Sequence, residues 1–212
     1  MNKVSTSDIK KLRDLTGAGF LDCKNALDES NSDFDKAIEF LRKKGVSTAQ
    51  KKSDRTASEG LIAISTNELN KEASIIELNS ETDFVARNDD FQFFASNLSK
   101  INLDQKGDLD KVMESKYNNT KDKVSDALTN LISKIGENLT IRRVDYINSI
   151  DGFVGTYVHN VEKDNMGKIG VLVSIKTDIE YSKVSDFLKN ICMHITAANP
   201  ISITSSDIDQ EI

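Results

Sequence analysis

The chain has 212 residues, of which 38% are hydrophobic and 29% are charged, and its formal net charge is −6 at pH 7. The composition is ordinary for a globular protein, and the length is long for one small domain and short for two full ones, so we expect two compact units, one of them small. The sequence contains no run of about 18 apolar residues, which a membrane-spanning helix needs, and its first residues lack the apolar segment of a secretory signal. We therefore expect a cytoplasmic protein that makes no contact with a membrane.

Residue types that bind metal ions or act as nucleophiles are scarce in this sequence. Its two cysteines, Cys23 and Cys192, and its two histidines, His159 and His194, do not have the number or spacing of a structural zinc site. The sequence also lacks the glycine-rich phosphate-binding loops and the G-x-S-x-G motif of hydrolases. We expect a protein that is not an enzyme and that binds no metal ion or other cofactor.

Charge is distributed unevenly along the chain. Residues 1–56 contain 12 Lys and Arg against 9 Asp and Glu, whereas the rest of the chain contains 16 against 25. The basic excess of the N-terminal segment is small, its charges are interleaved with acidic ones, and no aromatic stacking platform accompanies it. A direct nucleic-acid partner is therefore not expected.

Apolar side chains in residues 5–45 recur every three or four positions, which is the spacing of amphipathic helices. Three helices are predicted, the first after an N-cap at Ser7 and the second from near Phe20, with the glycine-containing segment 16–19 between them. The apolar positions assigned to the three helices are Ile9, Leu12 and Leu15, then Phe20, Cys23, Ala26 and Leu27, then Phe34, Ala37, Ile38 and Leu41. This segment predicts a minimal three-helix bundle.

The third helix is predicted to be short. Ser32 can cap its N-terminus, and Gly45 can adopt the left-handed conformation that ends it, with Lys43 and Lys44 beside its negative C-terminal end. The polar residues 46–59 lack a clear apolar stripe, so they predict a solvated connector, whether helical or not.

Beyond the connector the pattern changes to short apolar runs, which are typical of strands. Two such runs at 60–65 and 73–78 predict a strand pair, and a helix is predicted from about Asp83. The same order of two strands and a helix recurs at 152–158, 169–175 and 187–195. Helical spacing and then strand alternation occur between the two copies, at 109–113, 124–135 and 139–147.

This internal repeat predicts an α+β fold. The helical head and connector are expected at 1–56, a first α+β core subdomain with a helical hairpin at 57–150, and a partial second core subdomain at 151–212. The core would then consist of duplicated α+β subdomains with antiparallel strands, of which the second copy is incomplete.

Motifs in several parts of the chain resemble those of one family. They are 12–27 (LRDLTGAGFLDCKNAL), 82–87 (TDFVAR) with Phe91, 134–138 (KIGEN) with 141–143 (IRR), 157–159 (YVH), 167–173 (GKIGVLV) and 193–198 (MHITAA) with Pro200. In this order, and across essentially the whole chain, the sequence resembles bacterial elongation factor Ts. The resemblance implies that the protein binds the GTPase elongation factor Tu and promotes release of its GDP during translation elongation. It also implies a head similar to ubiquitin-associated domains.

The resemblance further implies which residues contact the partner. In the head, the family contacts match one residue before and two residues after the Thr-Gly-Ala-Gly loop. In the core, an Asp-Phe pair and its neighbours match the segment that is inserted beside the magnesium-binding part of the partner's nucleotide site, and a histidine also touches the partner. The predicted partner-binding residues are Arg13, Phe20, Leu21, Thr82, Asp83, Phe84, Val85 and His159.

The residue pattern alone leaves structural alternatives open for the core positions. Asp83 can cap the helix that follows it and can pair with Arg87 at four-residue spacing. Phe84 can be a core residue under the second strand, and His159 can be an ordinary surface histidine.

Alternatives also remain open for the head. Arg13 can be a solvated charge, and because Phe20 and Leu21 are adjacent on one helix, only one of them is expected to face outward beside the glycine loop. An exposed apolar residue there indicates a contact surface. The alternative function is a ubiquitin-associated-like module that recognises a nascent chain or another protein.

The C-terminal end departs from the family pattern. Family members generally continue beyond this point with a helical insertion, the rest of the second subdomain and a C-terminal helix, whereas this chain stops inside the second copy after 207–212. We therefore expect a C-terminally truncated chain. The sequence predicts no oligomeric state.

Overall fold

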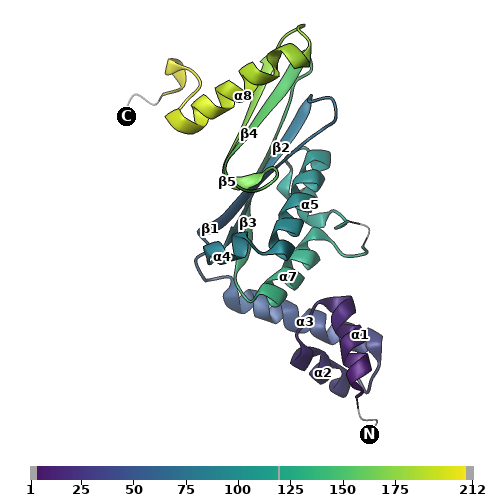
Figure 1. Cartoon of the computed structure of the whole chain (residues 1–212). Helices are drawn as coiled ribbons and strands as arrows, with labels where there is room; N and C mark the ends of the chain where they lie inside the picture. The colour runs from purple at the N-terminus through teal and green to yellow at the C-terminus, as the bar shows by residue number, and fades with distance from the viewer. Residues whose placement is uncertain (1–3, 119, 209–212) are drawn as a thin grey trace. The chain divides into compact units, whose positions relative to one another are not determined.

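The computed structural model describes residues 4–118 and 120–208 (Figure 1). The predicted α+β class is confirmed, with an N-terminal helical region followed by helices and an antiparallel sheet. The end of the predicted second copy, at 209–212, lies outside the described residues.

The chain divides into two compact units, each assembled from three segments. The first unit consists of Met1–Gly60, Leu78–Phe93 and Asp110–Ile141, and the second of Leu61–Glu77, Phe94–Leu109 and Arg142–Ile212. The predicted division into a head and two core subdomains, with limits at 56 and 150, stays a prediction.

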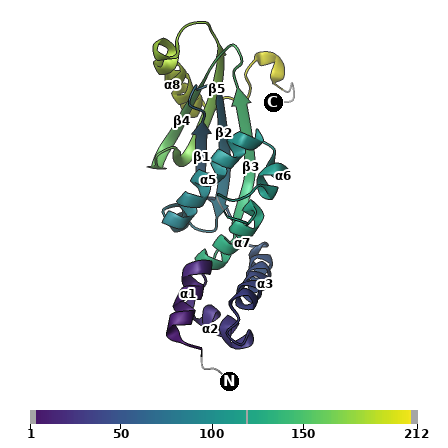
Figure 2. The same ribbon diagram turned by 90° about the vertical axis from the view of Figure 1, so that its right-hand side faces the viewer.

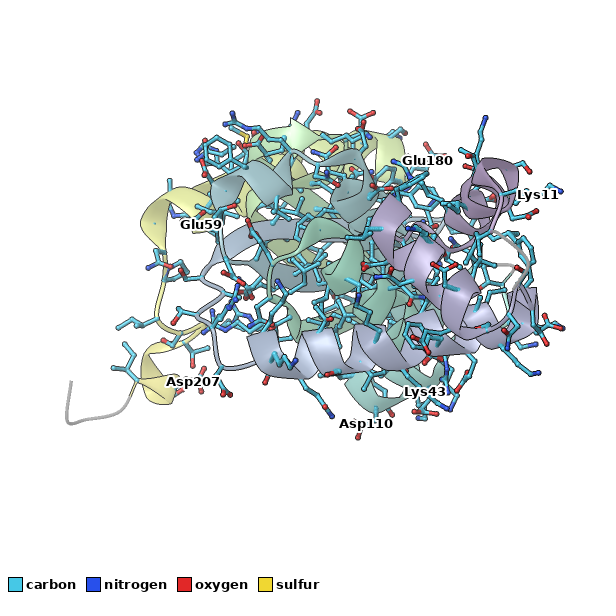
Figure 3. The ribbon with its side chains drawn as sticks, turned by 90° about the horizontal axis from the view of Figure 1, so that it is seen from below. Lys11, Lys43, Glu59, Asp110, Glu180 and Asp207 are labelled. Atoms are coloured by element: carbon cyan, nitrogen blue, oxygen red, sulfur yellow. The ribbon has the colours of Figure 1, made fainter. Side chains whose placement is uncertain are left out.

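Three helices form the N-terminal part of the first unit. They are α1 (Thr6–Thr16), α2 (Phe20–Glu29) and α3 (Phe34–Lys52). Their buried side chains are contributed by all three helices: Ile9, Leu12, Cys23, Ala26, Leu27 and Ala37. The charged side chains Lys11 and Lys43 are exposed and point away from the helices (Figure 3). The helix spacing therefore predicted the bundle, because burial of one face of each helix stabilises it.

The capping residues of two helices differ from the prediction. Ser5, not Ser7, caps α1, and its hydroxyl accepts the Asp8 N–H at 3.1 Å. Asp33, not Ser32, caps α3, since Ser32 has a φ of +64° and an N-cap residue needs an extended backbone.

The predicted end of the third helix at Gly45 is wrong, because α3 continues for another seven residues to Lys52. Gly45 is buried in the middle of the helix, where a Cβ atom would lie 3.1 Å from Ser133 Oγ of α7 (Val124–Ile135). The missing side chain lets the two helices approach closely. Half of the predicted connector is therefore helix, and the last turn carries Lys51 and Lys52.

One sheet contains all five strands of the described residues, in the order β3-β2-β1-β5-β4. The strands are β1 (Glu59–Thr66), β2 (Glu72–Ser80), β3 (Leu139–Asn148), β4 (Gly152–Lys163) and β5 (Met166–Lys176). β1 and β4 both pair antiparallel with β5, for example at Ile62 with Gly167 and at Phe153 with Ile175.

Helices cover the sheet in the second unit (Figure 2). α8 (Tyr181–Ala198) packs on β4 and β5, where Leu188 lies so close to Gly155 that a Cβ atom there would be 2.6 Å from it. α5 (Asp89–Gln105) lies on β1 and β2, because Ser99 contacts Ser65 at 2.7 Å and accepts from Ser74 Oγ at 2.6 Å. Two strands followed by a helix thus occur twice, whereas their origin by duplication stays a prediction.

The head core generates a paired prediction on α2. Leu27→Ala should lower the free energy of unfolding by about 2–5 kcal/mol, because Leu27 is fully buried and its removal leaves a cavity. Leu21→Ala, in the same helix but 65% exposed, should change it by less than about 0.5 kcal/mol. Urea unfolding followed by circular dichroism measures both, and equal effects of the two variants would contradict the assignment of the core.

The sheet of the second unit generates a prediction on acid stability. Burial alone would raise the pKa of Glu77, but hydrogen bonds from Arg143 (2.6 Å) and Arg142 (3.0 Å) outweigh it and hold this pKa below its ordinary value. The unfolded chain therefore binds a proton at Glu77 more readily, so the free energy of unfolding should fall as the pH drops from the ordinary carboxyl pKa through that of folded Glu77. Urea titrations at several pH values measure the free energy of unfolding, which should depend less on pH in Arg143→Gln than in the unchanged chain.

Candidate functional site

A short turn after β2 presents two of the predicted partner-binding residues. Its helix α4 (Asp83–Ala86) has Thr82 as N-cap. Val85 and Ala86 are 6% and 1% exposed and attach the turn to the first unit, whereas Asp83 and Phe84 are exposed. The turn is therefore amphipathic within four residues.

Phe84 is 80% exposed, although it is one of the largest apolar side chains. The alternative of a core residue under the second strand is therefore wrong. A ring in this position gains little burial from the fold, and a large exposed apolar side chain is a candidate contact for another molecule. The alternative that Asp83 caps the helix is also wrong, because Thr82 occupies the cap and Asp83 is the first helical residue.

Two crossed carboxylate contacts connect the residues before the turn to the loop after α7. The Glu137 carboxylate accepts the Thr82 N–H at 3.0 Å and the Thr82 hydroxyl at 2.7 Å. In the reverse direction, the Glu81 carboxylate accepts the Asn138 N–H at 2.6 Å. We call this arrangement of residues 81–82 and 137–138 the carboxylate clamp. No signal in the sequence indicated it, because its halves are more than 50 residues apart.

The clamp continues to the end of the α3 segment. The Asn138 amide donates to the Arg55 carbonyl at 2.7 Å, and the Arg55 guanidinium pairs with Glu81 at 3.5 Å. Lys52 donates to the carbonyl of Gly136, the residue that ends α7. The polar segment after the head helices is thus fixed to the same loop that holds the turn.

Beyond the turn, Asn88 caps the start of α5 by accepting from the N–H groups of Asp90 (3.0 Å) and Phe91 (3.2 Å). Lys134 of α7 pairs with Asp90 at 2.8 Å, and its stem lies so near Gly17 of the head that a Cβ atom there would be 3.6 Å from it. Lys134 therefore lies beside the head loop and pairs with a residue that follows the turn.

The loop between α1 and α2 exposes apolar side chains. Gly17 has a φ of +69° and ends α1 by donating its N–H to the Arg13 carbonyl at 2.8 Å. Phe20 and Leu21 follow, 50% and 65% exposed, so the expectation that only one of them faces outward is wrong. Leu15, which the spacing assigned to the core, is 70% exposed and adds to this surface. Leu15 is not among the described residues that form the head core or pack against it.

Two further predicted residues have exposed side chains. Arg13 lies on α1. His159 lies on β4 of the second unit, where its Nδ1 is 3.2 Å from the Tyr157 hydroxyl. Both positions are open to a partner, and their roles stay predictions.

The described residues contain no group of three or more His, Cys, Asp or Glu side chains that could hold a metal ion. Burial raises the pKa of Cys192 to about 11 and also raises that of Cys23, so both thiols are protonated at neutral pH and are poor nucleophiles. In the same part of the chain, none of the helices has the length and apolar character needed to cross a membrane.

Comparison with known proteins adds to this geometry. The family model described as Elongation factor TS matches residues 81–212. Elongation factor Ts of Bartonella bacilliformis is 44% identical over 209 residues, which cover 99% of this chain and 67% of that protein. For the proteins of the same name from Mesorhizobium japonicum and Methylorubrum extorquens, the identity is 44% and 41%, covering 97% and 100% of this chain and 66% and 69% of those proteins.

The chain therefore spans about two thirds of the length of these relatives. The matches define the class of protein as a translation elongation factor. More narrowly, the chain belongs to the elongation factor Ts family.

The contrast between two phenylalanines generates a stability prediction. Phe84→Ala should change the free energy of unfolding by less than about 0.5 kcal/mol, because the ring is already in water. Phe91→Ala, seven residues later and fully buried, should lower it by about 3–5 kcal/mol. Thermal unfolding of both variants measures this difference, and a large loss in Phe84→Ala would mean that the ring is packed.

Proposed function

We propose that this protein is a guanine nucleotide exchange factor that binds elongation factor Tu and promotes release of GDP during translation elongation. Membership of the elongation factor Ts family supports the process and the partner. The observation that carries the proposal is the 80% exposure of Phe84 on a turn that is fixed by buried neighbours and by the carboxylate clamp.

The proposed mechanism requires no chemistry on the nucleotide. A GTPase holds its nucleotide through backbone amides, a lysine and a Mg²⁺ ion, so an exchange factor has to stabilise a conformation in which these contacts are weakened. Burial of one phenylalanine ring contributes about 2–3 kcal/mol, which is roughly a 30- to 150-fold shift if the pocket exists only in the opened partner. The exchange factor in this proposal is not an enzyme and needs no cofactor.

The predicted residues take different parts in this proposal. Phe84 enters the partner, and the exposed carboxylate of Asp83 lies beside it, near the magnesium-binding part of the nucleotide site. Val85 is buried and Thr82 is bonded to Glu137, so these two hold the turn instead of presenting a surface.

The head and the second unit supply the remaining contacts. Phe20 and Leu21, together with Arg13, form the surface that binds the nucleotide-binding domain of the partner, and His159 makes a contact from the second unit. We place the protein in the cytoplasm, where translation elongation takes place.

A second function is favoured by one observation. Leu15, Phe20 and Leu21 expose apolar surface around the glycine loop of a three-helix bundle, and such a surface can recognise a nascent chain or another protein. In that case the head alone would account for binding, and substitution of Phe84 would have no effect.

A nucleotide-release assay tests the exchange function. Phe84→Ala should reduce the stimulated rate of release of a fluorescent GDP analogue from purified elongation factor Tu by about tenfold or more, since the burial energy of the ring is lost. Phe187→Ala on α8 is the matched control, because that ring is 58% exposed and lies on another element. The proposal fails if the unchanged chain does not accelerate GDP release, or if both variants reduce it equally.

A further inference from the structure

Glu137 lies directly after Gly136, which ends α7 in the left-handed conformation with a φ of +85°. Its two carboxylate oxygens accept from two different donors of one residue, the N–H and the hydroxyl of Thr82. Both contacts join atoms that are 55 residues apart in sequence. They therefore fix the place of the Asp83–Phe84 turn relative to α7 and not merely its local shape.

We propose that Glu137 is a positioning residue, which holds the turn so that the Phe84 ring is presented to the partner in one orientation. The inference rests on the proposed exchange function and deepens it. Glu137 itself acts through Thr82 and makes no contact with the nucleotide.

The turn needs such a residue because it cannot hold itself. A helix of four residues is far shorter than one that is stable alone, and the Thr82 side chain forms no capping hydrogen bond to α4. Its hydroxyl is donated to Glu137 instead. Hydrogen bonds to a charged acceptor are stronger than those between neutral groups, so this pair outweighs the local cap that is lost.

The reverse half of the clamp supports the same role. Glu81 accepts from the Asn138 N–H, so each carboxylate binds the backbone of the residue that follows the other one. Such crossed contacts oppose both sliding and rotation of the two segments. A loosened turn would have to be ordered again during association, which costs free energy and lowers the binding affinity.

The chemistry of the site distinguishes Glu from its isosteric amide. A carboxylate offers acceptors only, and Thr82 presents two donors to it. In Glu137→Gln, the amide oxygen can still accept the Thr82 N–H, but the amide NH2 group would have to donate to the Thr82 hydroxyl, which then acts as an acceptor. The variant therefore removes the negative charge from both contacts and weakens them without changing the size of the side chain.

The first test needs no partner. Amide hydrogen exchange measured by NMR should be about tenfold faster or more at Thr82 in Glu137→Gln, with unchanged protection at Leu131 and Ile132 of α7. The matched control is Glu114→Gln, in which the same chemical change removes an exposed pair with Lys123. Unchanged exchange at Thr82 would overturn the proposal.

The second test asks whether Glu137 acts through Phe84. Glu137→Gln should reduce stimulated GDP release about tenfold in the unchanged background and less than twofold in the Phe84→Ala background, as expected for residues that act as a unit. Equal reductions in both backgrounds would overturn the positioning role, because a general loss of folding acts independently of Phe84.

Variants of Thr82 keep the proposal testable if Glu137→Gln does not fold. Thr82→Ser retains both donors and should stimulate GDP release from elongation factor Tu as the unchanged chain does. Thr82→Val retains only the N–H donor and should stimulate GDP release less. Equal activity of these two variants would count against the proposal. If the unchanged chain does not stimulate GDP release from elongation factor Tu, the proposed function is wrong. The rate of amide hydrogen exchange at Thr82 then still decides whether Glu137 holds the turn.

Discussion

The first unit carries a large apolar ring, that of Phe84, in water on a short turn. The hydrophobic effect cannot hold the ring there, because it acts to bury it. The fold instead buries Val85 and Ala86, the two residues that follow, and binds Thr82, which lies two residues before, to Glu137. The residues on both sides of Phe84 in the sequence are thereby held in place, and their contacts keep the Phe84 ring exposed.

The C-terminal end of α7, which precedes Glu137, also lies beside the head. The stem of Lys134, in the last turn of α7, lies beside Gly17 and its ammonium group pairs with Asp90, and Gly136 accepts from Lys52 at the end of α3. The last turn of α7 and the residues that follow it therefore connect the loop that exposes Phe20 and Leu21 with the turn that exposes Phe84. Because several weak contacts converge on five consecutive residues, 134–138, small changes there can alter both surfaces at once.

Periodicity in the sequence predicted the class of fold, since burial of one helix face or one strand face leaves a repeating pattern. It failed where packing between elements decides. A glycine such as Gly45 is typical of a helix end. Here it lies inside α3, where the close approach of Ser133 leaves little room for a side chain. Phe84 and Phe91 are equally apolar, and only the tertiary structure separates the exposed ring from the buried one. The role proposed for Glu137 depends on a contact across 55 residues, which no local pattern can contain.

The arrangement has a thermodynamic consequence for the proposed exchange role. Thermodynamic linkage is reciprocal: if this protein weakens the binding of GDP to the partner by some factor, GDP weakens the binding of this protein to the partner by the same factor. In this proposal one ring supplies roughly 30- to 150-fold of that weakening, and the other contacts supply the rest. The Phe84 ring contributes its full burial energy to binding only if it is already ordered before association. A ring that becomes ordered during association loses part of that binding free energy to the entropy cost of ordering. A rigid turn with a single exposed ring therefore suits a factor that has to bind and leave in each cycle better than a large apolar interface does.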